Sequence, residues 1–226
     1  LEDAGIAYYF EQGDEGSQLV LADRPNKGAP AMDPIPYVAK PTARIDYEYV
    51  TAVRIAQRVR PGKFVQADVD WRRPPEAAIE AAASGGKGIE SALELYTLEY
   101  GSFLFKANDG GGGTPVADDR GAQRTDDAEG AKVAQRRLDA ARNDALVVHF
   151  STIAHGVRPG QVISFRGHPR ADLGPDKRLL ITELMVEGTN DGEWSMLGHA
   201  VFAAEPYRSP MKTPKPTIQG MQSAVV

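Results

Sequence analysis

The chain has 226 residues, of which 42% are hydrophobic, and this is enough for a sizeable core in one large domain or two smaller ones. Its net charge of −5, from 26 basic and 31 acidic residues, offers no basic field to nucleic acid or anionic lipid. No apolar run approaches the roughly 18 residues that span a bilayer, and the sequence has no cysteine for disulfides or thiolate metal sites.

The first residues predict a turn and then a β-hairpin. Leu1 to Gly5 is typical of the last turn of a helix, with Gly5 at the position that takes a left-handed conformation. Ile6 to Glu11 and Gln18 to Ala22 are apolar runs separated by Gly, Asp, Glu, Gly and Ser, which favours a hairpin with a loop of about five residues. Residues 23–46 are rich in Pro and Gly, so we expect a surface connection there.

The most regular alternation of the chain predicts a long, half-buried strand from Tyr47 to Val59. Its buried face would consist of Tyr47, Tyr49, Thr51, Val53, Ile55 and Val59. Pro61 and Gly62 predict a turn, after which Phe64 to Trp71 would return as the paired strand.

The next segments give weaker signals. The Ala-rich run Pro74 to Gly88 could begin a short helix at Pro75 or form a mobile insertion. Leu93 to Phe105 is rich in Leu and aromatic residues and predicts a strand. Asn108 to Gly113 is a glycine run without the Lys and Ser or Thr of a phosphate-binding loop, which favours a flexible loop.

One helix is predicted from Asp126 to Asn143, with capping-box spacing between Asp126 and Glu129. Its apolar face would hold Ala134, Leu138, Ala141 and Ala145, and its solvated face Lys132, Arg136, Arg137 and Arg142. Acidic residues alternate with these bases, so we interpret the basic side as a solvated helix face rather than an anion site. Leu146 to Ala154 then predicts a strand.

Two apolar strands, Gln161 to Phe165 and Leu179 to Val186, are predicted on either side of a loop at residues 167–175 that contains Gly and Pro. A final strand from Glu193 to Ala204 would carry Trp194, Met196 and Phe202 on one face.

No local pattern of catalytic or metal-ligating residues occurs, and we predict no catalytic, cofactor-binding or metal site. His149 and His155 are six residues apart on an expected strand and could share a face, but no metal-ligand spacing such as His-Glu-x-x-His accompanies them. His168 could bond a backbone carbonyl while Arg170 pairs with Asp172 to hold the loop. A serine-nucleophile motif is missing, whereas a glycosidase pair of carboxylates leaves no local signature and stays possible. Trp71 and Trp194 fit a core or a rim better than a sugar platform.

Several stretches together resemble one protein family. They read VRPGQ, SFRGHPRADL and LLITELMVEG within residues 157–188, and PYRSPMKTPKPTIQGMQSAVV at residues 206–226. They resemble the tail-hub-like module of VgrG, the spike proteins of type VI secretion. VRPGKFVQADVDWRRP at residues 59–74 matches moderately, and Leu93 to Phe105 departs from the family in lacking a Pro. The structural motif that the resemblance marks consists of Pro159, Gly160, Gly167, His168, Pro169, Arg170, Asp172, Gly188, Gly220 and Gln222.

The resemblance implies an α+β fold, mostly β, that is a tail-hub-like module with an Hcp-like β-barrel and a packed helix. It divides the chain into a β-rich part at residues 1–125, a helix with antiparallel barrel-like strands at 126–206, and an extended linker at 207–226 that leads to a downstream small barrel and needle. The first barrel of the module would be largely missing. Because the chain begins with Leu and stops in the apolar run Ala224 to Val226, we expect it to be part of a longer polypeptide.

The function that the resemblance implies is structural. Three copies would form a homotrimeric hub that caps the Hcp tube, contacts baseplate proteins, carries the needle, and meets a PAAR-type tip protein and effectors through the downstream part. We expect no cofactor, nucleic acid or membrane anchor, and assembly in the bacterial cytoplasm before secretion by the machine. The alternatives are a baseplate hub of a contractile phage tail and a cell-wall-acting hydrolase at the spike tip.

Overall fold

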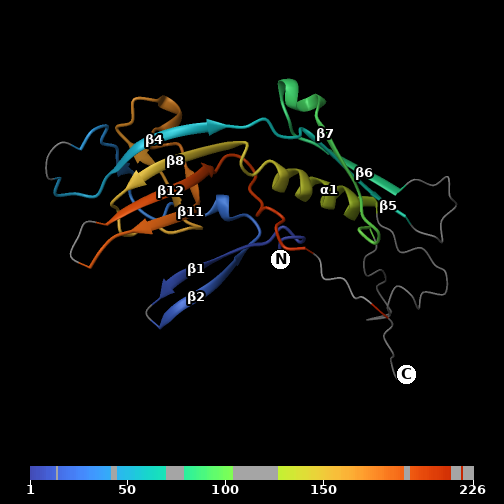
Figure 1. The fold of residues 1–226 in the computed structure, drawn as a ribbon, viewed down its shortest axis with the longest axis horizontal. Helices are drawn as coiled ribbons and strands as arrows, with labels where there is room; N and C mark the ends of the chain where they lie inside the picture. Colours follow the sequence, from blue (N-terminus) through green and yellow to red (C-terminus); the bar gives the residue numbers. More distant parts are fainter. Residues whose placement is uncertain are drawn as a thin grey trace.

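A computed structural model of the chain describes residues 1–13, 15–41, 45–69, 79–103, 127–190, 194–214 and 220 (Figure 1). Strands dominate, and α1 is the only α-helix in these ranges, so the expected mostly β fold with a packed helix is confirmed. The elements are β1 (Ala7–Gly13), β2 (Gly16–Ala22), η1 (Pro25–Lys27), β3 (Ile35–Pro36), β4 (Val50–Gln57), β5 (Lys63–Asp68), β6 (Ile79–Ser84), η2 (Gly88–Ala92), β7 (Glu94–Leu98), α1 (Asp127–Ala141), β8 (Leu146–Thr152), β9 (Val162–Ile163), β10 (Phe165–Arg166), η4 (Ala171–Leu173), β11 (Leu179–Glu187) and β12 (Ser195–Phe202).

The larger part of the fold is a five-stranded antiparallel sheet in the order β4-β8-β12-β11-β9. Inward side chains alternate along the strands, as a sheet with one buried face requires. They form the main core, whose largest members include Phe150, Ile163, Phe165, Leu179 and Ile181. The strands predicted at Leu146 to Ala154 and at Leu179 to Val186 are therefore confirmed.

The segment predicted as a surface connection closes this sheet into a small barrel. β3 pairs in parallel with β10, and Tyr37 bridges to Val50 of β4. The backbone N–H of Tyr37 donates to Arg166 at 2.8 Å and that of Val38 to Val50 at 2.9 Å. Ile35 points into the core and is buried. The surface prediction for residues 23–46 was wrong here, because a two-residue strand between prolines leaves no periodic signal.

β4 changes face in mid-strand. Ala52 has a φ of 49°, and the register with β8 shifts between Thr51 and Arg54, which marks a β-bulge. As a result Val50 is buried, although the predicted alternation placed it outward. The predicted buried face was wrong at both ends, since Tyr47 and Val59 are more than half exposed.

The strand after Pro61 and Gly62 was predicted to return beside β4, but this prediction was wrong. β5 lies in a separate three-stranded sheet, antiparallel to β6 and parallel to β7. The short helix considered at Pro75 to Ala81 is contradicted in its second half, since Ile79 already belongs to strand β6. β7 confirms the strand predicted within Leu93 to Phe105. Trp71 and the glycine run at 108–113 lie outside the described residues.

α1 packs on the three-stranded sheet through its contacts with β5 and β6 (Figure 1). Ala134 and Leu138 are fully buried against Phe64, Ala83 and Phe103, which confirms these two residues of the predicted apolar face. The other two, Ala141 and Ala145, are half-buried, and Ala145 lies beyond the end of the helix. Alanines on β6 alternate inward, and their small side chains let the helix approach the sheet closely. The Asp126 cap lies outside the described residues.

The basic residues predicted on the solvated face are not all solvated; three of them lie on α1, and Arg142 lies just after its end. Of the four predicted residues, only Lys132 is exposed to solvent. The side chains of Arg136, Arg137 and Arg142 are 25%, 13% and 20% exposed. They pair with Glu129, with Asp3 and Glu99, and with Glu90, respectively. The sequence does not reveal these partners, because most of them lie on other elements.

The N-terminal hairpin is confirmed, with a shorter loop than predicted. β1 and β2 pair from Ala7 and Ala22 down to Gly13 and Gly16, so two residues connect them instead of about five. The preceding residues form a turn that ends at Gly5, whose φ of +71° is the left-handed conformation expected there. The hairpin projects from the rest of the protein (Figure 1).

Candidate functional site

The most concentrated polar network lies at the seam where the chain passes between the barrel and the layer formed by α1 and the three-stranded sheet. It passes once between β4 and β5 and once between α1 and β8. The two crossings are joined directly, because the N–H of Arg58 donates to the carbonyl of Ala145 at 2.9 Å. Side chains from both crossings then converge on this point.

Asp144 is the acceptor at the centre of the first cluster. Arg58 Nη1 donates to Asp144 Oδ2 at 2.9 Å, Arg60 Nε donates to Asp144 Oδ1 at 2.6 Å, and Arg60 Nη2 also donates to Asp144 Oδ2. Burial opposes ionisation of Asp144, but the hydrogen bonds from Arg60 and Arg58 outweigh it, so its pKa lies below the ordinary value. The bidentate contact between Arg60 and Asp144 fixes the relative orientation of the two side chains as well as their distance.

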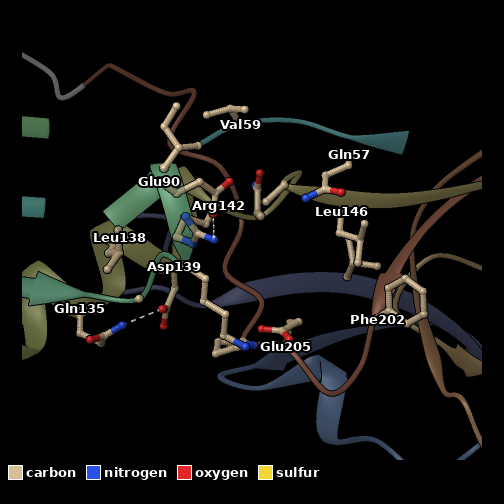
Figure 2. A pocket seen from close by; sticks show the side chains of 17 residues that line it. Gln57, Val59, Glu90, Gln135, Leu138, Asp139, Arg142, Leu146, Phe202 and Glu205 are labelled. Atoms are coloured by element: carbon tan, nitrogen blue, oxygen red, sulfur yellow. Dashed lines mark hydrogen bonds and ion pairs between the residues drawn. The ribbon is translucent and has the colours of Figure 1, made fainter. Parts of the chain in front are cut away.

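Arg142 and Glu90 form the second cluster. Arg142 Nη2 donates to Glu90 Oε2 at 2.7 Å (Figure 2). Arg142 Nη1 donates to the carbonyl of Pro61 at 2.8 Å. Glu90 Oε1 accepts the backbone N–H of Arg60 at 3.1 Å. Hydrogen bonds from Arg142 and from that N–H lower the pKa of Glu90. We call the five residues Arg58, Arg60, Glu90, Arg142 and Asp144 the clasp.

A crevice of about 560 Å³ opens beside the clasp (Figure 2). Gln57, Leu146 and Phe202 line it from the barrel, and Leu138 and Asp139 from α1. Burial raises the pKa of Asp139, which accepts a hydrogen bond from Gln135 Nε2 at 2.8 Å. The acidic groups on the α1 side are thus engaged in structural pairs, with Asp139 on Gln135 and Glu90 on Arg142.

The loop after β10 holds several residues of the predicted motif. Gly167 has a φ of +77°, which Gly tolerates without strain. The Arg170 guanidinium pairs with Asp172 at 2.6 and 2.9 Å, as predicted. Pro169, which lies between His168 and Arg170 in the sequence, is exposed.

His168 bonds differently from the expected manner. Its Nδ1 accepts the backbone N–H of Arg170 at 3.1 Å instead of donating to a carbonyl, because the turn brings an N–H and not a C=O to the ring. Its ring packs edge-on against Tyr37, with ring centres 4.3 Å apart. Burial lowers its pKa, which favours the neutral ring that this bond needs.

Two motif glycines are sites of close aromatic approach. Gly160, which follows Pro159 at the turn before β9, has a φ of +88° and donates its N–H to Ile181 at 2.8 Å. A Cβ at Gly160 would overlap the Tyr9 ring of the hairpin, and one at Gly188 would lie 2.8 Å from the Trp194 ring. Trp194 precedes β12, covers Gly188 and is 51% exposed, whereas Met196 is buried.

Residues after β12 run along the N-terminal turn without helix or strand, as prolines favour. Tyr207 packs on the small core of Val162, Leu180 and Val201. Arg208 donates to the Gly5 carbonyl at 2.8 Å and also pairs with Asp23.

The last described residues of this run are also held. Glu2 accepts the backbone N–H groups of Lys212 and Thr213, each at 2.9 Å. Gly220 has a φ of +116°, and Gln222 lies outside the described residues.

The histidines are arranged differently from the prediction. His155 lies in a turn after β8 and shares no strand with His149. His149 instead faces His199 across β8 and β12, with ring centres 4.4 Å apart, and His199 Nδ1 lies 3.1 Å from Glu183 Oε2. Within the described ranges no group of three or more His, Asp or Glu residues could hold a metal ion. In the same part of the chain, no helix has the length and apolar character to cross a membrane.

No local sequence pattern predicts the clasp. Arg58 and Asp144 are 86 residues apart, and Arg142 and Glu90 are 52 apart. The sequence shows Arg58 and Arg60 close to the turn at Pro61, but a local pattern cannot identify a partner that is distant along the chain.

Comparison with known proteins places this arrangement in a family. A family model described as the phage tail baseplate hub (GPD) matches residues 1–192. Two type VI secretion system spike proteins of Pseudomonas aeruginosa, VgrG1a and VgrG1c, are each 22% identical over 237 aligned positions that cover the whole chain. The chain spans only 33% and 30% of their lengths, about a third of each relative.

A solved structure shows the same fold. The E. coli c3393 protein, described as a component of the type VI secretion system with structural similarity to the T4 bacteriophage tail proteins gp27 and gp5, matches 97% of the chain with a TM-score of 0.54 and 14% identity. The chain covers 40% of that protein. Since the hub model spans residues 1–192 of 226, the chain belongs to the phage tail baseplate hub family.

Proposed function

We propose that the protein is a structural component of the puncturing spike of a type VI secretion machine. The observation that carries this proposal is the match of the whole chain to two spike proteins, together with the hub family over residues 1–192. The role needs a rigid mount rather than a reactive centre. In support, the clasp, the motif loop and the connector after β12 use their charged groups in internal pairs.

The proposed assembly is a homotrimeric hub that caps the Hcp tube and contacts baseplate proteins. In it, residues 1–125 and 126–206 form the body of the hub, although β4 of the first part pairs with β8 of the second. Residues 207–226 lead to a downstream barrel and needle, which would meet a PAAR-type tip protein and effectors. The motif residues shape the turns of this body. Assembly takes place in the bacterial cytoplasm, and the machine then secretes the spike.

A second candidate is a baseplate hub of a contractile phage tail, which the description of the matching family favours. The experiment that separates the two is deletion of the gene in its own host, followed by detection of Hcp in the culture medium. Under the spike proposal Hcp release stops and returns with the wild-type gene. Unchanged Hcp release, or loss of phage particles instead, would favour the phage hub.

The proposed role involves no catalysis, and this has its own test. The purified protein is incubated with peptidoglycan and divalent metal ions, and soluble fragments are measured. We expect no turnover. Turnover that disappears on His168→Ala would establish the hydrolase alternative.

A longer polypeptide, extended through the downstream barrel and needle, should be a stable trimer with three-fold symmetry, because obligate oligomers bury large apolar surfaces. Light scattering after size exclusion measures its mass. An extended protein that stays monomeric at micromolar concentration would contradict the spike proposal.

A further inference from the structure

One face of the N-terminal hairpin is apolar and open to solvent. Tyr8 stands opposite Leu21, and Phe10 opposite Leu19, so the four side chains share a face. Each of them is more than half exposed. Tyr8 and Phe10 touch edge to face, with ring centres 6.5 Å apart. We call these four residues the hairpin face.

The opposite side of the hairpin is attached to the protein. Tyr9 lies over Gly160, and Val20, which pairs with Tyr9, is half-buried. The hairpin is thus held by one side and presents the other outward (Figure 1). Four large side chains that are more than half exposed amount to a patch on the order of 400 Å², and contiguous apolar patches of this size commonly mark interaction sites.

A second apolar surface lies on β7. Its residues Tyr96 and Leu98 share one face of the strand, and they and Tyr100 just beyond are between 48% and 76% exposed. Among the described strands, β7 pairs only with β5 and is an edge strand of its sheet. We call these three residues the β7 strip. Figure 1 shows the hairpin and β7 on opposite sides of the molecule.

We propose that the hairpin face of one copy packs on the β7 strip of a second copy of this chain. Two unlike apolar surfaces on one chain, well separated, are what a head-to-tail contact requires, and such contacts form a ring when the rotation between copies closes and a filament when it does not. A single self-complementary patch would produce only a two-fold dimer. This inference rests on the proposed function, because the proposed hub is a ring of three copies. The hairpin face and the β7 strip would be the surfaces that hold this ring together.

The area sets the strength of the contact. Two patches of about 400 Å² bury roughly 800 Å² in one interface, about half of the ~1,600 Å² of a standard stable complex. The contact should therefore be weak in the isolated chain and depend on concentration. Chain beyond these surfaces would have to supply the remaining stability of a hub.

The test is sedimentation velocity on residues 1–226 over a wide range of concentration. The hairpin variant is Phe10→Ser with Leu19→Ser, and the strip variant is Leu98→Ser with Tyr100→Ser. Met185→Ser, an exposed apolar residue on the barrel sheet, is the control. Circular dichroism verifies that every variant folds, as expected for exposed positions.

The wild-type chain and the control should form oligomers as concentration rises, whereas each double variant alone should stay monomeric. A mixture of the two variants should form dimers but no larger species, because only one intact hairpin face and one intact β7 strip can meet. A chain that is monomeric throughout would overturn the inference, as would oligomers that survive the strip variant. Neither of these results bears on Hcp release, so failure of the interface and failure of the spike role remain distinguishable.

Discussion

At Gly160, backbone conformation and side-chain packing impose the same requirement. The residue has a positive φ, and the Tyr9 ring occupies the space where a Cβ would project. Gly167 has a similar φ, but a Cβ there would meet no atom within 4 Å. A comparison of substitutions at the two glycines therefore separates two contributions to the loss of stability, that of a left-handed backbone and that of steric overlap.

Gly160→Ala and Gly167→Ala should therefore differ in stability. Each loses about 1–2 kcal/mol from the left-handed conformation, and Gly160→Ala should lose about 1–3 kcal/mol more from overlap with Tyr9. Urea denaturation measures both. Truncation by Tyr9→Ala should relieve the extra loss at Gly160. Equal losses for the two glycine variants would mean that the hairpin moves aside without cost.

Leu138 and Lys132 test the orientation of α1 in the same way. Leu138 is fully buried beneath the helix, so Leu138→Ala should lower the free energy of unfolding by about 2–5 kcal/mol. Lys132 is an exposed residue of the same helix, and Lys132→Ala should change it by less than about 0.5 kcal/mol. Similar losses in denaturant melts would show that the buried face of the helix is misplaced.

At the scale of the elements, the clasp is a connection whose strength depends on pH. Asp144 and Glu90 both have a pKa below the ordinary value, so the folded protein holds their charge more strongly than the unfolded chain does. Their stabilisation is full above the unfolded pKa of about 4 and is lost as the pH falls through the lower folded pKa. The clasp should therefore weaken only in acid.

Asp144→Asn should reduce stability by about 1–3 kcal/mol at neutral pH, because Arg58 and Arg60 lose a charged acceptor and an amide NH2 replaces one of its two oxygens. The difference from wild type should shrink as the pH falls below about 4 and through the lower folded pKa of Asp144, where the wild-type carboxylate also becomes neutral. Thermal or urea melts across pH measure it. Asp172→Asn, in the exposed pair with Arg170, is the control and should show a far smaller effect. A difference that stays constant in acid would mean that the charge of Asp144 is not involved.

The local sequence pattern correctly predicted elements whose side-chain burial is periodic. α1 and β8 each follow a period that their residues repeat along the element, whereas the N-terminal hairpin was predicted from two apolar runs around a loop that contains Gly. β6 could not be predicted, because the alanines of Ile79–Ser84 favour a helix and become a strand only through the sheet beside them and the helix above. The bulge at Ala52 reversed the inward face of β4 without any trace in the alternation.

The same limit applies to the candidate site. The turn geometry at Gly167 and the Arg170–Asp172 pair were predictable, because their partners are a few residues apart. The clasp was not, since its pairs join residues 52 to 86 positions apart. The orientation of His168 depends on the N–H that the turn presents, which the composition of the loop does not specify.

At the scale of the whole molecule, the barrel and the α1 layer have separate cores and are coupled through the seam. The barrel core and the core between α1 and β6 share no buried residue. The crossings beside the clasp and the clasp itself therefore carry much of the coupling between them. In the proposed hub, the two layers would have to move as one unit.

Arg60→Ala combined with Arg142→Ala should uncouple the layers without unfolding the barrel. Amide hydrogen exchange should become about tenfold to a hundredfold faster in β5 and β6, since lost hydrogen bonds of about 1–3 kcal/mol allow that layer to open locally. Exchange in β8 and β12 should stay close to wild type, because the barrel keeps its own core. Lys132→Ala should leave both regions unchanged. Equal acceleration in both sheets would mean that the layers unfold only together, and that the contacts coupling them extend beyond the clasp.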